Sequence, residues 1–128
     1  MPIALAAHHM SFPVRDVERS RVFYGTILGL AEKPRPPQLA AMFPGAWYQA
    51  GACEVHLIQY PDTMDVGTPP PTLNPMARHA AFTIADYQTT LAYLHTHGIA
   101  ALETNPDVGQ MWVRDPDGHI IELIVDRR

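Results

Sequence analysis

The chain has 128 residues, of which 17% are charged, and a formal net charge of −4. This length fits one domain, residues 1–128, that can bury about two-thirds of its unfolded surface. Basic residues cluster only at Arg127-Arg128, and the apolar runs fall well short of the roughly 20 residues that cross a bilayer. We therefore expect neither nucleic acid nor membrane as a partner.

A single cysteine, Cys53, excludes an internal disulfide and permits a reducing compartment. The opening residues 1–7 have no basic residue of the kind that begins a signal peptide. A cytoplasmic location is the expectation.

The first half of the chain alternates strand and helix signals. His9, Ser11 and Pro13 share one face of the first expected strand, because side chains alternate along a strand. Asp16 is a favourable helix N-cap, and Gly29 ends the apolar pattern of that helix. The strands expected in this half are 7–14, before the helix, and 46–50 and 53–60 after it. Between the helix and the second strand, the proline-rich residues 33–45 are expected to be a mobile or substrate-facing loop rather than a regular element.

Residues 61–77 are rich in proline and predict a stiff linker, after which the pattern of the first half begins again. Asp86 caps the second helix and Gly98 ends it. The strands expected here are 78–84, 99–103, 110–114 and 119–125. The last strand holds Glu122 in an apolar run. Since burial of a lone carboxylate costs several kcal/mol, Glu122 needs a cation, a hydrogen-bond network or a proton.

The two halves correspond residue by residue. His9 precedes Asp16 by seven residues, and His79 precedes Asp86 by the same number. Farther along, Glu-Val-His56-Leu-Ile corresponds to Ile-Ile-Glu122-Leu-Ile. A repeat of this kind predicts two copies of a unit made of one strand, one helix and three strands.

This duplicated pattern resembles the vicinal oxygen chelate superfamily, the fold of glyoxalases, bleomycin resistance proteins and extradiol dioxygenases. The resemblance covers residues 7–126. It implies an α+β fold in which two tandem βαβββ modules, residues 7–60 and 78–126, form a cup-shaped, partly open eight-stranded sheet. The segments that carry it are His9-Met-Ser-Phe-Pro-Val-Arg-Asp16, Phe23-Tyr24, Leu28-Gly29-Leu30, His79-Ala-Ala-Phe-Thr-Ile-Ala-Asp86 and Asp115-Pro-Asp-Gly-His-Ile-Ile-Glu122-Leu.

In metal-dependent members of that superfamily, the first and fourth strands of each module supply the ligands. Carried over residue by residue, these positions are His9, His56, His79 and Glu122. Imidazole and carboxylate groups suit a divalent metal ion such as Ni, Zn, Co, Mn or Fe(II). Glu54 lies two residues before His56 on the same strand face, so the choice between them as the fourth ligand stays open.

An ion in such a cup can bind two adjacent substrate oxygens and stabilise negative charge on an enolate oxygen. The resemblance therefore implies a small-molecule substrate and isomerase or lyase chemistry, with Glu122 as the catalytic base and Glu54 as the second candidate. One alternative is an Fe(II) extradiol-type dioxygenase that uses only His9, His79 and Glu122 as ligands. Another is a small-molecule or antibiotic-binding protein without catalysis. A homodimer is expected, because exposed sheet edges pair with other strands.

Strand alternation places His8 opposite His9, where a structural role is expected. His97, in the last turn of the second helix, is expected to cap that helix together with His95. Trp47 and Trp112 occupy corresponding third strands of the two modules, and one of them is expected to line the cup.

Overall fold

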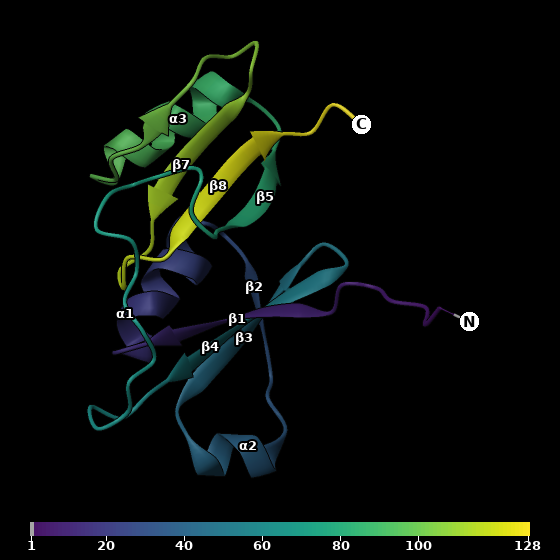
Figure 1. Cartoon of the computed structure of the whole chain (residues 1–128), viewed down its shortest axis with the longest axis vertical. Helices are drawn as coiled ribbons and strands as arrows, with labels where there is room; N and C mark the ends of the chain where they lie inside the picture. Colours follow the sequence, from purple (N-terminus) through teal and green to yellow (C-terminus); the bar gives the residue numbers. More distant parts are fainter. Residues whose placement is uncertain (1) are drawn as a thin grey trace. The chain divides into compact units, whose positions relative to one another are not determined.

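A computed structural model describes residues 2–128 of the chain, which divides into two compact units, Met1–Val66 and Gly67–Arg128. The boundary between the units lies within the proline-rich stretch 61–77. Each unit contains one four-stranded sheet together with helical segments (Figure 1). None of the helices described between residues 2 and 128 has the length and apolar character of a membrane span.

In the first unit the strand order is β1-β4-β3-β2, with β1 parallel to β4 and the other pairs antiparallel. The Asp16 carboxylate caps the first helix by accepting a hydrogen bond of 3.0 Å from the Glu18 N–H. That helix continues with π geometry, in which the Leu28 N–H donates to the Phe23 carbonyl at 2.8 Å. The elements are β1 (His9–Val14), α1 (Val17–Arg21), the π-helix η1 (Val22–Ile27), β2 (Ala31–Lys33), α2 (Pro37–Met42), β3 (Gly45–Ala50) and β4 (Cys53–Gln59).

The second unit repeats this plan with the strand order β5-β8-β7-β6. Its elements are β5 (Ala80–Ile84), α3 (Tyr87–Thr96), β6 (Leu102–Glu103), β7 (Gln110–Arg114) and β8 (Ile120–Val125). In Figure 1, α3 lies along one face of this sheet. Strand β5 is parallel to β8, as β1 is to β4. The predicted α+β class and the repeated order of one strand, one helix and three strands are confirmed.

The prediction that residues 33–45 form no regular element is wrong, because they include the helix α2. Pro37 occupies its first position, where the missing N–H of proline has no intrahelical partner to lose. Strand β2, at the start of this region, pairs its Lys33 with Trp47 of β3. The region is therefore tied to the sheet at both ends.

The core of each unit lies on one face of its sheet. Val14, Tyr24 and Leu57 are fully buried in the first unit, as are Val113 and Ile121 in the second. Because strands alternate, the opposite face is left for the polar and aromatic residues that the repeat singles out.

The Asp86 cap of α3 makes stability depend on pH in a predictable direction. Hydrogen bonds from the side chain and the backbone N–H of Thr89 lower the pKa of Asp86. A carboxyl group whose pKa is lowered by folding stabilises the protein above its unfolded pKa, and this contribution is lost as the pH falls through the folded pKa. Asp86→Asn retains a capping oxygen without the charge.

We therefore expect wild type to exceed Asp86→Asn in unfolding free energy at neutral pH. This advantage should begin to shrink near the unfolded Asp pKa of about 3.9 and should be lost as the pH falls through the lower folded pKa. Urea denaturation at several pH values measures the difference. An advantage that persisted unchanged in acid would contradict this assignment.

Candidate metal centre

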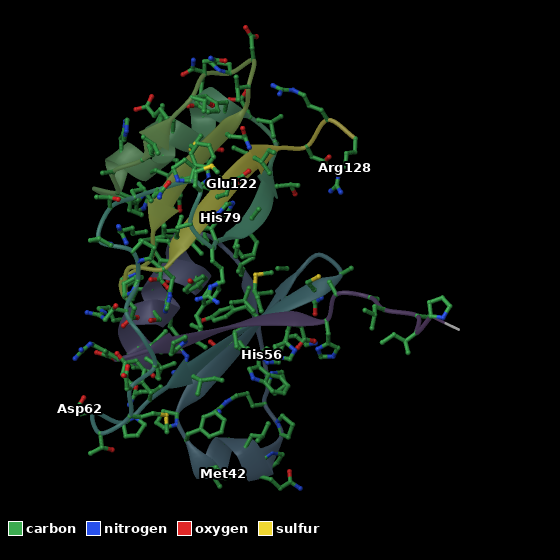
Figure 2. The ribbon with its side chains drawn as sticks, viewed as in Figure 1. Met42, His56, Asp62, His79, Glu122 and Arg128 are labelled. Carbon is green, nitrogen blue, oxygen red and sulfur yellow. The ribbon has the colours of Figure 1, made fainter. Side chains whose placement is uncertain are left out.

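Glu122 of β8 is buried, with 7% of its surface exposed, and its carboxylate is held by three side chains. Trp112 Nε1 donates to Oε1 at 3.1 Å, and Gln110 Nε2 donates to Oε2 at 3.1 Å. His79 Nε2 lies 2.9 Å from Oε1 (Figure 2). The buried carboxylate thus has the hydrogen-bond network that its position in an apolar strand requires.

His79, just before β5, faces an acceptor on both sides of its ring. Nδ1 lies 2.7 Å from the Ala77 carbonyl oxygen, and Nε2 faces the Glu122 carboxylate. A neutral imidazole has only one N–H, so a proton or a metal ion must satisfy the second contact. Two adjacent ligands of an octahedral ion, each about 2.1 Å from it, are themselves about 3 Å apart. The His79–Glu122 separation therefore fits a shared divalent ion.

His56 of β4 lies in a stack of three aromatic rings in the first unit. The Trp47 ring lies on one side, with centroids 4.1 Å apart and planes 4° from parallel. The His9 ring is also stacked on His56, at 3.9 Å and 15°. Trp47 and His56 are register partners in β3 and β4, just as Trp112 and Glu122 are in β7 and β8. Each unit therefore places a tryptophan against the predicted ligand of its fourth strand.

Glu54 joins this cluster through both of its carboxylate oxygens. Oε1 lies 2.9 Å from His56 Nε2, and Oε2 forms an ion pair with Lys33 of β2. The hydrogen bond from His56, followed by that from Lys33, lowers the pKa of Glu54 to about 2. At neutral pH Glu54 is consequently an anion that accepts from both neighbours.

His8 contacts His9 directly, with their Nδ1 atoms 2.8 Å apart. The prediction that His8 faces away from His9 is wrong, because β1 begins at His9 and strand alternation does not extend to residue 8. Partial desolvation, then the imidazoles of His56 and His8, lowers the pKa of His9. The neutral form, which has a lone pair for a metal ion, is thereby favoured.

The capping role expected for His97 is confirmed. Its Nδ1 lies 2.9 Å from the Tyr93 carbonyl oxygen at the end of α3, which can only accept. The same carbonyl also accepts from the His97 backbone N–H at 3.3 Å, so this histidine closes the end of the helix with both its ring and its backbone.

The structure brings His9 to His56 in one unit and His79 to Glu122 in the other. Within residues 2–128, no three His, Cys, Asp or Glu side chains are already grouped as a metal site. The convergence of all four candidates on one ion, in a cup formed by both modules, stays a prediction.

Sequence reasoning missed two residues at the candidate site: Gln110, which contacts Glu122, and Lys33, which contacts Glu54. Gln110 lies two residues before Trp112 and therefore on the same face of β7, which is the only signal the sequence offers. Lys33 reaches Glu54 across β3, through a register that the sequence does not specify.

Residues 6–123 match the Glyoxalase/Bleomycin resistance protein/Dioxygenase superfamily. The chain belongs to this superfamily. It is 30% identical over 122 residues to Glyoxylase I 4 of Arabidopsis thaliana, a match that covers 91% of this chain and 68% of that protein.

Two solved structures share the fold over nearly the whole length of both chains. A glyoxalase family protein from Bacillus anthracis is 25% identical with a TM-score of 0.78, and the match covers 99% of each chain. A glyoxalase/dioxygenase from Nostoc punctiforme is 26% identical with a TM-score of 0.76, and covers 100% of this chain and 99% of the other.

Proposed function

We propose that this protein is a divalent-metal-dependent enzyme of the glyoxalase type. It binds a small-molecule substrate through two adjacent oxygens and transfers a proton at the neighbouring carbon, as an isomerase or lyase does. The observation that carries this proposal is the 2.9 Å approach of His79 Nε2 to Glu122, made by a ring whose other nitrogen already faces a carbonyl oxygen. Similarity to a plant protein named glyoxylase I favours this class.

The residues that would hold the ion are His9, His56, His79 and Glu122. When bound, a divalent ion supplies Lewis-acid stabilisation of negative charge on a substrate oxygen. Glu122 is the residue suited to moving the proton. Its Oε1 lies near two ring nitrogens, from His79 and Trp112, whereas Oε2 accepts from the Gln110 side chain. Oε2 is therefore the oxygen more available to accept a proton, and Trp112 and Gln110 orient the carboxylate.

A second candidate function is an Fe(II) extradiol-type dioxygenase with His9, His79 and Glu122 as the ligands. The contact between His56 Nε2 and Glu54 favours this alternative, because a histidine bonded to a carboxylate can also act as an acid or base beside the ion. The two candidates differ in whether His56 binds the metal.

The two tryptophans provide a test of the shared ion, because the chain contains only Trp47 and Trp112. Wild-type protein labelled with 5-fluorotryptophan should give two fluorine NMR signals, which Trp47→Phe and Trp112→Phe assign. Titration of metal-free protein with Ni, Zn, Co or Mn, and anaerobically with Fe(II), should shift both signals together. A shift of the Trp112 signal alone would leave His9 and His56 outside the site and overturn the four-ligand assignment.

Reaction class is tested with the loaded enzyme in deuterated water. Proton transfer predicts solvent deuterium in the product from an α-hydroxycarbonyl or thiohemiacetal substrate. Oxygen consumption with a catechol, without exchange for any carbonyl substrate, would favour the dioxygenase. Ion binding with neither reaction would point to a binding protein.

We also propose that the chain forms a homodimer. Each four-stranded sheet ends in two edge strands, β1 and β2 in the first unit and β5 and β6 in the second. Edge strands carry backbone groups able to pair with another chain. Light scattering at micromolar concentration should give twice the chain mass of 14.2 kDa. A value near that of one chain would rule the dimer out.

A further inference from the structure

The carboxylate of Glu54 is occupied on both sides. Oε1 accepts from His56 Nε2 at 2.9 Å, and Oε2 is paired with the Lys33 ammonium group. Lys33, Trp47 and His56 are register partners across β2, β3 and β4, so their side chains share one face of the sheet. Glu54, two residues before His56, lies on the same face. A carboxylate engaged in this way is less available as a base or a metal ligand than Glu122.

The His56 ring is fixed in two respects. Stacking against Trp47 and His9, at 4.1 and 3.9 Å, sets the plane of the ring. The Glu54 oxygen then sets its orientation within that plane. Since a carboxylate only accepts, Nε2 has to carry the hydrogen, and Nδ1 of the neutral ring keeps its lone pair. Nδ1 has no hydrogen-bond partner among residues 2–128.

We propose that Lys33 and Glu54 form a positioning pair that holds His56 in the tautomer with Nε2–H and leaves Nδ1 as the nitrogen for a ligand. This rests on the proposed metal-dependent function. Histidines that ligate metals commonly donate their second ring N–H to a carboxylate, which fixes the tautomer and strengthens the ligand. Lys33 acts through Glu54 and touches no reacting group.

Removal of Lys33 should change the affinity for a cation in one direction if this proposal holds and in the opposite direction if it does not. Loss of a positive charge near a cation site should raise cation affinity through Coulomb attraction. If Glu54 were itself a metal ligand, its release from Lys33 should also raise affinity. Loss of a positioning pair should instead lower affinity by about 10- to 100-fold.

The test compares Lys33→Met with Arg21→Met, which removes the same charge from the opposite sheet face. Arg21 forms an ion pair with Glu32, which directly precedes Lys33 in β2 and is the register partner of Tyr48. Because side chains alternate along a strand, Glu32 and Tyr48 lie on the sheet face opposite Lys33 and Trp47. Lys33 is partly exposed, with 38% of its side chain accessible, so loss of its ion pair should leave the protein folded. Lys33→Arg keeps the charge and should restore wild-type behaviour.

Two measurements are made on each variant. Nickel affinity is determined by competition with a chelator. Long-range proton–nitrogen NMR spectra of the metal-free protein show which ring nitrogen of His56 carries the hydrogen, with His56→Gln identifying its signals. We expect one Nε2–H form in wild type and Arg21→Met. Lys33→Met should give a mixture of tautomers and about 10- to 100-fold weaker nickel binding.

The proposed positioning pair and the proposed metal-dependent function can be overturned independently. Nickel binding to Lys33→Met that equals or exceeds binding to Arg21→Met, with an unchanged tautomer, overturns the positioning pair and leaves the metal-dependent function standing. The expected tautomers without nickel binding to any variant would overturn the function and retain the pair.

Discussion

Glu122→Ala should reduce the affinity for a divalent ion by more than about 100-fold, whereas Glu54→Ala should reduce it by about 10- to 100-fold, the range measured for partners of metal ligands. Glu122 lies 2.9 Å from His79 Nε2 and would bind the ion directly. Glu54 meets His56 and would act on the ion only through that ring. Metal content of the purified variants, together with chelator competition, measures both losses.

Because Glu122 also accepts from Trp112 and Gln110, its removal leaves the buried Trp112 N–H and the part-buried Gln110 amide without this acceptor. Glu122→Gln serves as the companion variant, since its amide oxygen can still accept from Trp112 while the charge is lost. Circular dichroism and thermal unfolding establish that both variants are folded. Equal losses of metal affinity in Glu54→Ala and Glu122→Ala, or a greater loss in Glu54→Ala, would overturn the assignment of Glu122 as the ligand and Glu54 as the partner of a ligand.

Gly45→Ala should lower the free energy of unfolding by about 3 kcal/mol, as overpacking a close-packed site does. A Cβ atom at Gly45 would lie 2.5 Å from the Leu57 carbonyl oxygen of β4 and 3.0 Å from Arg35 Nη1. The first of these neighbours is backbone in a paired strand, so it cannot move aside without disrupting the sheet.

Gly51→Ala separates this crowding from the general cost of replacing glycine. Gly51 has a φ of +59° but no heavy atom within 4 Å of an added Cβ, so only backbone strain of about 1 to 2 kcal/mol is expected. Urea denaturation of both variants gives the comparison. A loss at Gly45 no larger than that at Gly51 would show that β4 accommodates the methyl group.

The sequence specified the repeat because its markers act locally. Asp16 and Asp86 cap the first helices of their units, and each follows its strand at the same spacing. Helix α2 was missed although Leu-Ala-Ala-Met after Pro37 is a run of strong helix formers. The prolines in this region predict a break in regular structure, but Pro37 occupies the first helical position, where it does not interrupt the helix.

The sequence predicts which candidate residues lie on the first and fourth strands of each unit. It does not predict which side chains those residues contact. That His79 meets Glu122 follows from a pairing of β5 with β8 that the repeat implies. That Lys33 meets Glu54 depends on the register of three strands, which backbone pairing sets. The contact of His8 with His9 depends on the residue at which β1 begins.

The strand order places the four candidate ligands on elements of unequal rigidity. His56 and Glu122 belong to β4 and β8, which are paired on both sides. His9 is the first residue of the edge strand β1, and His79 directly precedes the edge strand β5. Edge strands and strand ends open more readily than interior ones. We therefore expect His9 and His79 to separate from their partners in brief local openings while both sheets stay intact, which would let an ion bound by the four candidates exchange with solvent.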